Sequence, residues 1–163
     1  FQYGSRINTV FSTVDALEEY VASADLVIGA VLVPGGAAPK LVSRELVSRM
    51  NRGAVLVDVA IDQGGCFATS KPTTLADPIF TVNGVVHYCV SNMPGAVART
   101  STFALNNATL PFVIALANKG YRKALIDDPH LRNGLNVYRV KLTHEAAARD
   151  LRLTYSSAVD VLA

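Results

Sequence analysis

The sequence predicts an α/β fold built on a doubly wound parallel sheet, and three observations support this prediction. Residues 26–33, 54–60 and 86–90 are continuous apolar runs, as expected of strands buried on both faces. Segments with apolar residues at helical spacing separate these runs, and strand–helix alternation is typical of parallel sheets covered by helices. No repeat, low-complexity tract or flexible linker interrupts the pattern. We therefore expect neighbouring parallel strands with helices on the faces.

Composition sets the class of protein. The 163 residues are 50% hydrophobic and 17% charged, which is enough apolar material for a real core. The net charge of +2, without a Lys/Arg cluster, argues against a nucleic-acid partner. No run approaches the roughly 18 apolar residues of a membrane helix. Cys66 and Cys89 have neither a metal-ligand spacing nor a disulfide pattern, which predicts free thiols in the cytoplasm.

The elements follow in chain order. Residues 6–11 alternate and are β-branched, which predicts a first strand, and Ser12 and Thr13 are typical of a helix start. Ser43 is expected to cap a helix over 44–50, ended by Gly53. A long helix is expected over 100–118 with one apolar face, ended by Gly120, and Pro111 should kink or divide it. Two shorter helices are expected over 122–127 and 144–151.

Candidate ligand-binding residues follow the strands, because ligands of an open parallel sheet bind at the carboxyl ends of its strands. Asp62 is the sharpest feature: it could bind ribose hydroxyls or transfer a proton, or it could cap the turn after the strand. Asp58 lies inside the strand, where a hydrogen-bonded structural role is expected. Asn92 could present its amide to a nicotinamide or ribose, or its side chain could close an Asx-turn before Pro94.

Other features point to packing or solvent. The chain contains no G-x-G-x-x-G phosphate-binding sequence. His87 is expected in the core of a strand, whereas His130 and His144 are expected to face solvent. None of these histidines has a metal-ligand spacing, so no metal is predicted.

Four stretches resemble the alanine dehydrogenase family. They are ADLVIGAVLVPGGAAPKLVS from Ala24, VLVDVAIDQGGCF from Val55, HYCVSNMPGAVARTST from His87 and ALNNATLPFVIALANKG from Ala104. The transhydrogenase α-subunit shares the pattern more loosely. The resemblance implies the second half of an NAD-binding Rossmann domain over residues 1–98. Residues 99–163 would then be carboxy-terminal helices that return to a substrate domain.

The resemblance also implies site residues. Asp62 would be the catalytic carboxylate, and Ser12 would lie near the adenosine of NAD. Lys71 stands where relatives can have an arginine near the cofactor. The remaining residues expected at the cofactor are Val31, Leu32, Val59, Ala60, Ile61, Val90, Ser91, Asn92 and Met93.

The implied activity is the NAD-dependent interconversion of L-alanine with pyruvate and ammonia, in a cytoplasmic homo-oligomer that is hexameric by resemblance. The phosphate-binding loop and the residues that hold pyruvate would precede this chain, so the chain alone is expected to be inactive. Two alternatives are kept open: an NAD-binding transhydrogenase-like subunit, and an inactive fragment that serves only as an assembly module.

Overall fold

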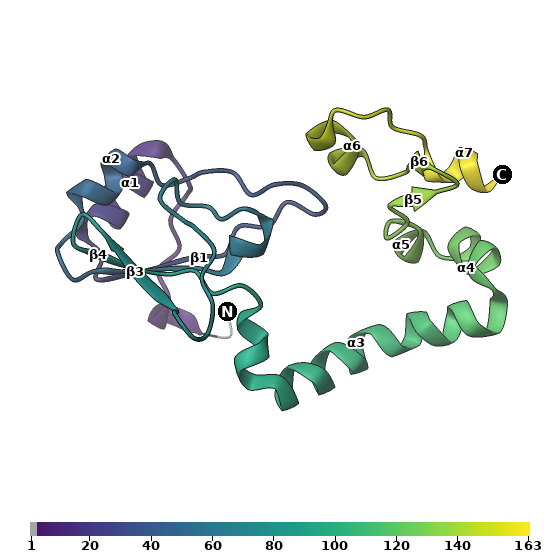
Figure 1. Cartoon of the computed structure of the whole chain (residues 1–163), viewed down its shortest axis with the longest axis horizontal. Helices are drawn as coiled ribbons and strands as arrows, with labels where there is room; N and C mark the ends of the chain where they lie inside the picture. Colours follow the sequence, from purple (N-terminus) through teal and green to yellow (C-terminus); the bar gives the residue numbers. More distant parts are fainter. Residues whose placement is uncertain (1–2) are drawn as a thin grey trace. The chain divides into compact units, whose positions relative to one another are not determined.

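The computed structural model describes residues 3–163, which form two compact units. The first comprises residues 3–32 and 38–91, and the second comprises residues 33–37 and 92–163. Figure 1 shows the elements of both units along the chain. The assignment of residues 1–98 and 99–163 to a cofactor domain and a substrate domain stays a prediction.

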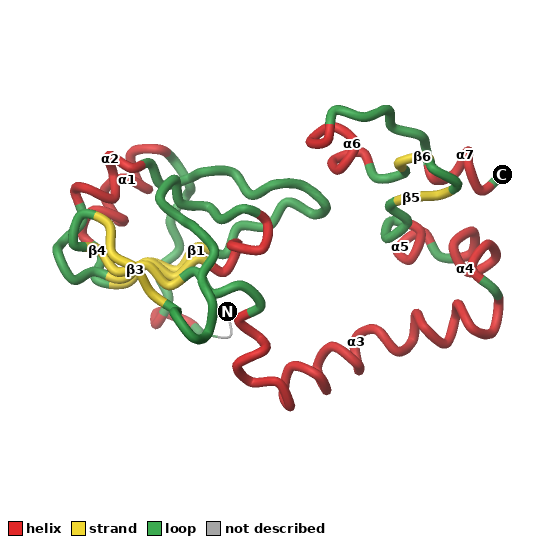
Figure 2. The backbone as a smooth tube through the Cα atoms, viewed as in Figure 1, coloured by secondary structure: helices red, strands yellow, loops and turns green. Residues whose placement is uncertain are grey.

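The first unit is built on a four-stranded sheet with the order β1-β2-β4-β3. Figure 2 shows the strands of this sheet in yellow. Strands β1 (Leu26–Gly29), β2 (Val55–Asp58) and β4 (Val85–Tyr88) are parallel, whereas β3 (Ile79–Val82) runs antiparallel to β4. Gly29 pairs with Asp58, so β1 and β2 end at the same level. The predicted α/β class with a parallel sheet is confirmed.

Two predicted details of the sheet are wrong. Residues 6–11 form no strand: Arg6 ends a short 3-10 helix, η1 (Gly4–Arg6), and Val10 and Phe11 are 50% and 87% exposed. Alternating residues form a strand only when a neighbouring strand takes up their backbone hydrogen bonds, and the described chain places none there. The β3–β4 hairpin was not predicted. The three predicted parallel strands that do form are shorter than their apolar runs.

Two helices cover the core of the first unit. Thr13 caps α1 (Val14–Ser23), and Ser43 caps α2 (Arg44–Arg49), each by accepting a backbone N–H three residues later. The cap of α2 confirms the prediction for Ser43, but α2 ends before Met50 rather than at Gly53. The buried apolar side chains that these elements share include Val21, Val42, Leu46, Val47, Met50, Leu56, Phe67 and Val85.

Only alternate residues of β1 are covered. Val27 and Gly29 are half-buried or buried, whereas Leu26 and Ile28 are 56% and 60% exposed. The sequence predicted burial on both faces, and in this unit one face of β1 is open.

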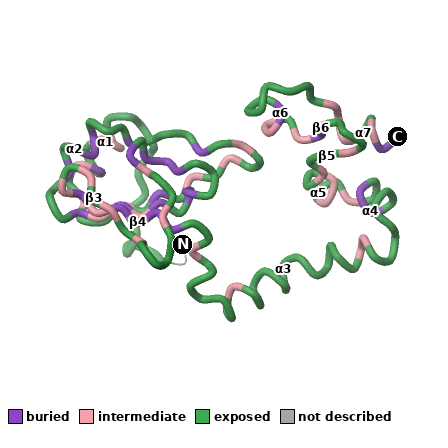
Figure 3. Tube along the Cα trace, in the orientation of Figure 1, coloured by how far each residue is buried: buried purple, intermediate pink, exposed green. Residues whose placement is uncertain are grey.

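The second unit begins with η3 (Met93–Val97) and the long helix α3 (Ala98–Lys119), which Gly120 ends as predicted. Pro111 does not divide α3. The apolar face predicted for α3 is not buried. No residue of this helix is buried, as Figure 3 shows. Within residues 3–163, no helix is long and apolar enough to cross a bilayer.

The rest of the second unit consists of short elements. Helices α4 (Tyr121–Asp127) and α6 (Glu145–Leu151) confirm the two predicted short helices. The sequence did not predict α5 (Pro129–Arg132), β5 (Val137–Tyr138), β6 (Lys141–Leu142) or α7 (Ala158–Leu162).

The loop over residues 33–37 packs on α6. Asp150 accepts a hydrogen bond of 2.9 Å from the Ala37 N–H, and Gly35, at φ +70°, leaves no room for a side chain beside the His144 ring. His144 is half-buried and caps α6 by accepting from the Ala147 N–H, so the prediction that it faces solvent is wrong. His130 is exposed as predicted.

Candidate active site

Asp62 lies on a short 3-10 helix, η2 (Val59–Gln63), that follows β2 directly. Ala60 and Ile61 point into the core at 2% and 3% exposure, which leaves Asp62 at the surface. Gly64, at φ +91°, ends the turn and donates its N–H to carbonyls of η2. A buried pair therefore anchors the turn and presents an exposed carboxylate at the carboxyl end of a central strand.

The segment over residues 38–42 holds the end of this turn. The Ala38 N–H donates to the Gln63 carbonyl at 2.9 Å, and the Leu41 N–H donates to the Cys66 carbonyl at 2.8 Å. Between these two bonds, the Lys40 ammonium donates to the carbonyls of Gly64 at 2.5 Å and Gly65 at 2.8 Å. Residues 38–41 are thus hydrogen-bonded to each residue from Gln63 to Cys66.

Asp58 holds the other side of the turn from inside the protein. Its fully buried carboxylate accepts from the Cys66 N–H at 2.9 Å and from the Ser70 hydroxyl at 2.5 Å. A side-chain carbon on Gly65 would lie 2.6 Å from the same carboxylate. The predicted structural role of Asp58 is confirmed. Glycine at position 65 therefore allows the backbone to approach Asp58 closely.

The two thiols near Asp58 are unreactive. Burial raises the pKa of Cys66 to about 12, and the negative charge of Asp58 adds to this effect. Burial also raises the pKa of Cys89. Both cysteines are free and buried. Because the thiolate is the reactive form, neither is a nucleophile at neutral pH.

Lys71 lies over the unpredicted hairpin. Its ammonium is 4.6 Å from the centroid of the Phe80 ring, which stacks on His87 at 4.8 Å. His87 is fully buried between Thr69 and the Val85 carbonyl, as predicted for a core residue. Lys71 therefore has a partner within the protein, a cation–π contact.

Most predicted cofactor residues share one edge of the sheet. Val31 and Leu32 follow β1, Val59 to Asp62 follow β2, and Val90 and Ser91 follow β4, and these three strands are parallel neighbours. Leu32 and Val59 are 64% and 50% exposed, and Ser91 is also exposed. Ala60, Ile61 and Val90 are buried, so their side chains serve the core and only their backbone can meet a ligand.

Three predicted residues lie elsewhere. Ser12 lines a hollow of about 370 Å³ between the starts of α1 and α2, together with Thr13 and Lys40. Asn92 and Met93 open the second unit. Asn92 has φ +54°, and its main-chain carbonyl accepts from the Gly95 N–H at 2.8 Å, so the turn here is closed by the backbone and includes Pro94.

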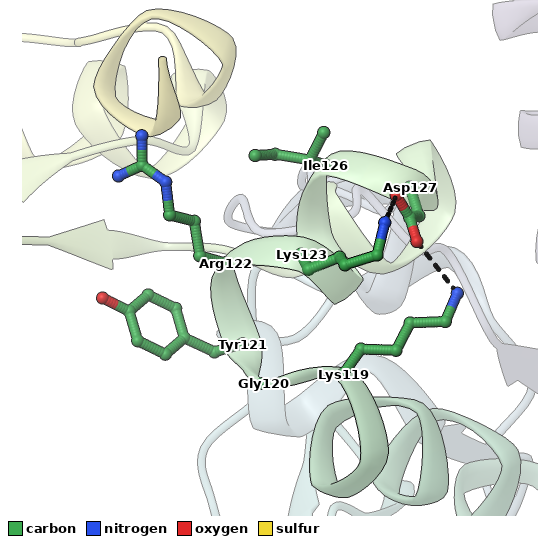
Figure 4. A pocket seen from close by; sticks show the side chains of 7 residues that line it. All are labelled: Lys119, Gly120, Tyr121, Arg122, Lys123, Ile126 and Asp127. Atoms are coloured by element: carbon green, nitrogen blue, oxygen red, sulfur yellow. Dashed lines mark hydrogen bonds and ion pairs between the residues drawn. The ribbon is translucent and has the colours of Figure 1, made fainter.

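A separate hollow of about 440 Å³ lies at the start of α4, away from every predicted site residue along the chain (Figure 4). Asp127 accepts from both Lys119 and Lys123 there, at 3.0 and 3.1 Å. These two hydrogen bonds lower the pKa of the Asp127 carboxyl. One carboxylate is therefore shared by two of the three cations that line this hollow, and the third, Arg122, donates to the Ala163 carbonyl.

Comparison with known proteins decides the family. Residues 1–145 match the family described as "Alanine dehydrogenase/PNT, C-terminal domain". The chain belongs to this alanine dehydrogenase/PNT family. It is 65% identical to alanine dehydrogenase of Halomonas elongata and 55% identical to that of Mycolicibacterium smegmatis. Each alignment covers 99% of the chain and 43% or 44% of the relative, so the chain spans less than half the length of these relatives.

Solved structures agree with this assignment. An L-alanine dehydrogenase structure matches 99% of the chain and 42% of its own with a TM-score of 0.75 and 50% identity. A transhydrogenase from Sinorhizobium meliloti matches 57% of the chain and 27% of its own with a TM-score of 0.51 and 31% identity. The resemblance found in the sequence, with alanine dehydrogenase nearer than transhydrogenase, is confirmed.

Lys40, whose ammonium contacts the turn of Asp62, is a residue to which the sequence analysis assigned no role. Its partners are main-chain carbonyls, and carbonyls that are brought together by a turn leave no mark in the identity of the residues.

Proposed function

We propose that the protein carrying this chain oxidatively deaminates L-alanine to pyruvate and ammonia with NAD, and catalyses the reverse reductive amination. One observation carries the proposal: Asp62 is an exposed carboxylate on a braced turn at the carboxyl edge of three parallel strands. Alanine dehydrogenases that are 65% and 55% identical supply the substrate class.

The residues at this edge suit the nicotinamide and ribose part of NAD. Leu32 and Val59 offer exposed apolar side chains for a flat ring, and Asp62 can accept hydrogen bonds from ribose hydroxyls or from the substrate. Ser12, Lys71, Ser91, Asn92 and Met93 complete the proposed contacts, together with the backbone of Val31, Ala60, Ile61 and Val90. The bound cofactor would accept the hydride from the alanine Cα.

Asp62 would act on the rest of the substrate. Loss of hydride leaves an iminium cation, and a nearby carboxylate stabilises that positive charge. Water then adds to the iminium carbon, and Asp62 can take the proton that this water loses. The same carboxyl group can return a proton when ammonia leaves.

The test is Asp62→Asn in the full-length gene product. The amide keeps the size of the side chain but removes its charge and basicity, so kcat should fall about 10²–10⁴-fold, the usual contribution of a general acid–base group. NAD binding, measured by calorimetry, should change little. Near-normal kcat would reduce Asp62 to a cap or a ribose ligand.

A transhydrogenase-like subunit is the second candidate, and the Sinorhizobium meliloti structure is the observation in its favour. An assay with alanine and NAD separates the two candidates, because only the dehydrogenase reduces NAD with alanine as the sole reductant.

We further propose a cytoplasmic homo-oligomer, hexameric by family resemblance. Two buried free cysteines fit a reducing compartment. Light scattering on the full-length protein measures the assembly.

A further inference from the structure

We propose that Lys40 is a positioning residue for Asp62: its ammonium restricts the movement of the turn that carries the catalytic carboxylate. This inference rests on the proposed function, because it assigns Lys40 an effect on turnover that passes through Asp62. Lys40 itself is not required to touch substrate or cofactor.

The geometry of the ammonium supports this role. Two of its three N–H donors are directed at consecutive carbonyls, those of Gly64 and Gly65, at 2.5 and 2.8 Å. These carbonyls lie two and three residues after Asp62. A cation also suits this place, because the carbonyl end of a helical turn carries partial negative charge.

The backbone of the turn is least restricted at its two glycines. Gly64 and Gly65 both have positive φ, at +91° and +75°, and glycine is the residue least restricted in the unfolded or loosened chain. Asp58 fixes the chain after the turn through Cys66, and Ala38 binds Gln63 just before the glycines. Lys40 is the side chain that spans the two glycines between those fixed points.

The magnitude follows from the sensitivity of catalysis to geometry. A displacement of about 1 Å at a reacting group can cost on the order of 10²-fold in rate. The Asp62 carboxylate lies two residues before the glycine pair, so a looser pair should displace it. We therefore expect a part of this loss in rate.

The experiment compares Lys40→Met and Lys40→Arg in the full-length gene product, with Lys141→Met, an exposed lysine on β6, as the matched control. Lys40→Met should lower kcat about tenfold, with KM for NAD changed less than about twofold. Lys40→Arg keeps the charge and the donors and should recover most of kcat. Lys141→Met should behave as wild type. A rise in KM for NAD without a fall in kcat would overturn the proposal.

Combination with Asp62→Asn tests the route of the effect. If Lys40 acts through Asp62, the double variant Lys40→Met/Asp62→Asn should be no slower than Asp62→Asn alone. Additive losses would show a general structural effect and overturn the proposal.

Hydrogen exchange separates this inference from the proposed function. The N–H groups of Gly64 and Gly65 are bonded within the turn, to Ile61 and Ala60, and should exchange faster in Lys40→Met than in wild type. Unchanged exchange overturns the positioning role. Faster exchange together with normal turnover in both Lys40→Met and Asp62→Asn would instead support the restriction of the turn by Lys40 and overturn the catalytic role of Asp62.

Discussion

Two aspartates, four residues apart, have opposite environments. Asp58 ends β2 with its side chain on the covered face of the sheet, where three groups from Cys66 and Ser70 surround it. Asp62 lies one short turn later, and the burial of Ala60 and Ile61 leaves it at the surface. The same chemical group is thus buried and structural at one position and exposed at the surface at the other.

Asp58→Ala should destabilise the protein by about 2–4 kcal/mol, because it leaves the buried Cys66 N–H and the partly buried Ser70 hydroxyl without their acceptor. Urea unfolding measures this change. Asp77→Ala, at an exposed position, is the control and should lie within about 0.5 kcal/mol of wild type. Equal effects of the two substitutions would contradict the role assigned to Asp58.

Stability should also depend on pH through His87. Burial lowers the pKa of His87, with the hydrogen bond to Val85 opposing the effect. The unfolded chain therefore binds a proton more readily than the folded one. The stabilisation by neutral His87 is present above about pH 6.5 and is lost as pH falls through that value toward the lower, folded pKa.

Urea unfolding at pH 7.5 and pH 5.5 checks this sign. The wild type should be less stable at pH 5.5, and His87→Gln should show a smaller difference between the two pH values. An equal pH dependence in both proteins would assign the effect to another group.

At the scale of elements, the boundaries that were predicted correctly follow from single residues at the ends of helices. Ser43 begins α2 because its side chain accepts a backbone N–H of the first turn. Gly120 ends α3 because glycine readily adopts the positive φ that terminates a helix. Asn83-Gly84, both at positive φ, is the usual sequence of a two-residue hairpin turn and could have identified β3 and β4. Residues 6–11 had the right alternation, but a strand also needs a partner.

Gly29→Ala tests how closely β1 packs on the loop after β2. A methyl group at this position would lie 2.7 Å from the Phe67 ring and would also overlap Cys66, and both neighbours are buried. We expect a loss of about 1–3 kcal/mol in unfolding free energy, the usual cost of overpacking.

Ile28→Ala is the matched change on the same strand, at an exposed position. It should cost less than about 1 kcal/mol, the span of strand propensities. If denaturant unfolding gave Gly29→Ala the smaller cost, the close packing of β1 on Phe67 would be wrong.

At the scale of the whole molecule, the glycine-rich loops already have partners. Gly64 and Gly65 direct their carbonyls to Lys40, and Gly35 lies against His144. The N–H groups of Gly36, Gly64 and Gly65 are bonded to the Val33, Ile61 and Ala60 carbonyls, so they are not free to cradle a diphosphate. The 163 residues contain no G-x-G-x-x-G sequence either.

The 163-residue chain by itself should therefore bind NAD more weakly than micromolar and should not oxidise alanine. The exposed apolar side chains of α3, such as Phe103, Leu105 and Phe112, should also make it associate with itself. Calorimetry with NAD, a spectrophotometric assay with alanine, and light scattering measure these properties. Micromolar affinity for NAD would contradict this prediction, because it would require a phosphate-binding site within these 163 residues.

The sequence alone determined the α/β class, the family and the candidate Asp62. Apolar runs, capping residues and motif order are local, so they can be read in one dimension. Tertiary structure decided which strands pair, which face of β1 is covered, and that Asp58 and Lys40 both bind residues at the end of the Asp62 turn. Those outcomes depend on contacts between residues that are separated in the chain, and the partners of Lys40 are main-chain carbonyls, which every residue carries.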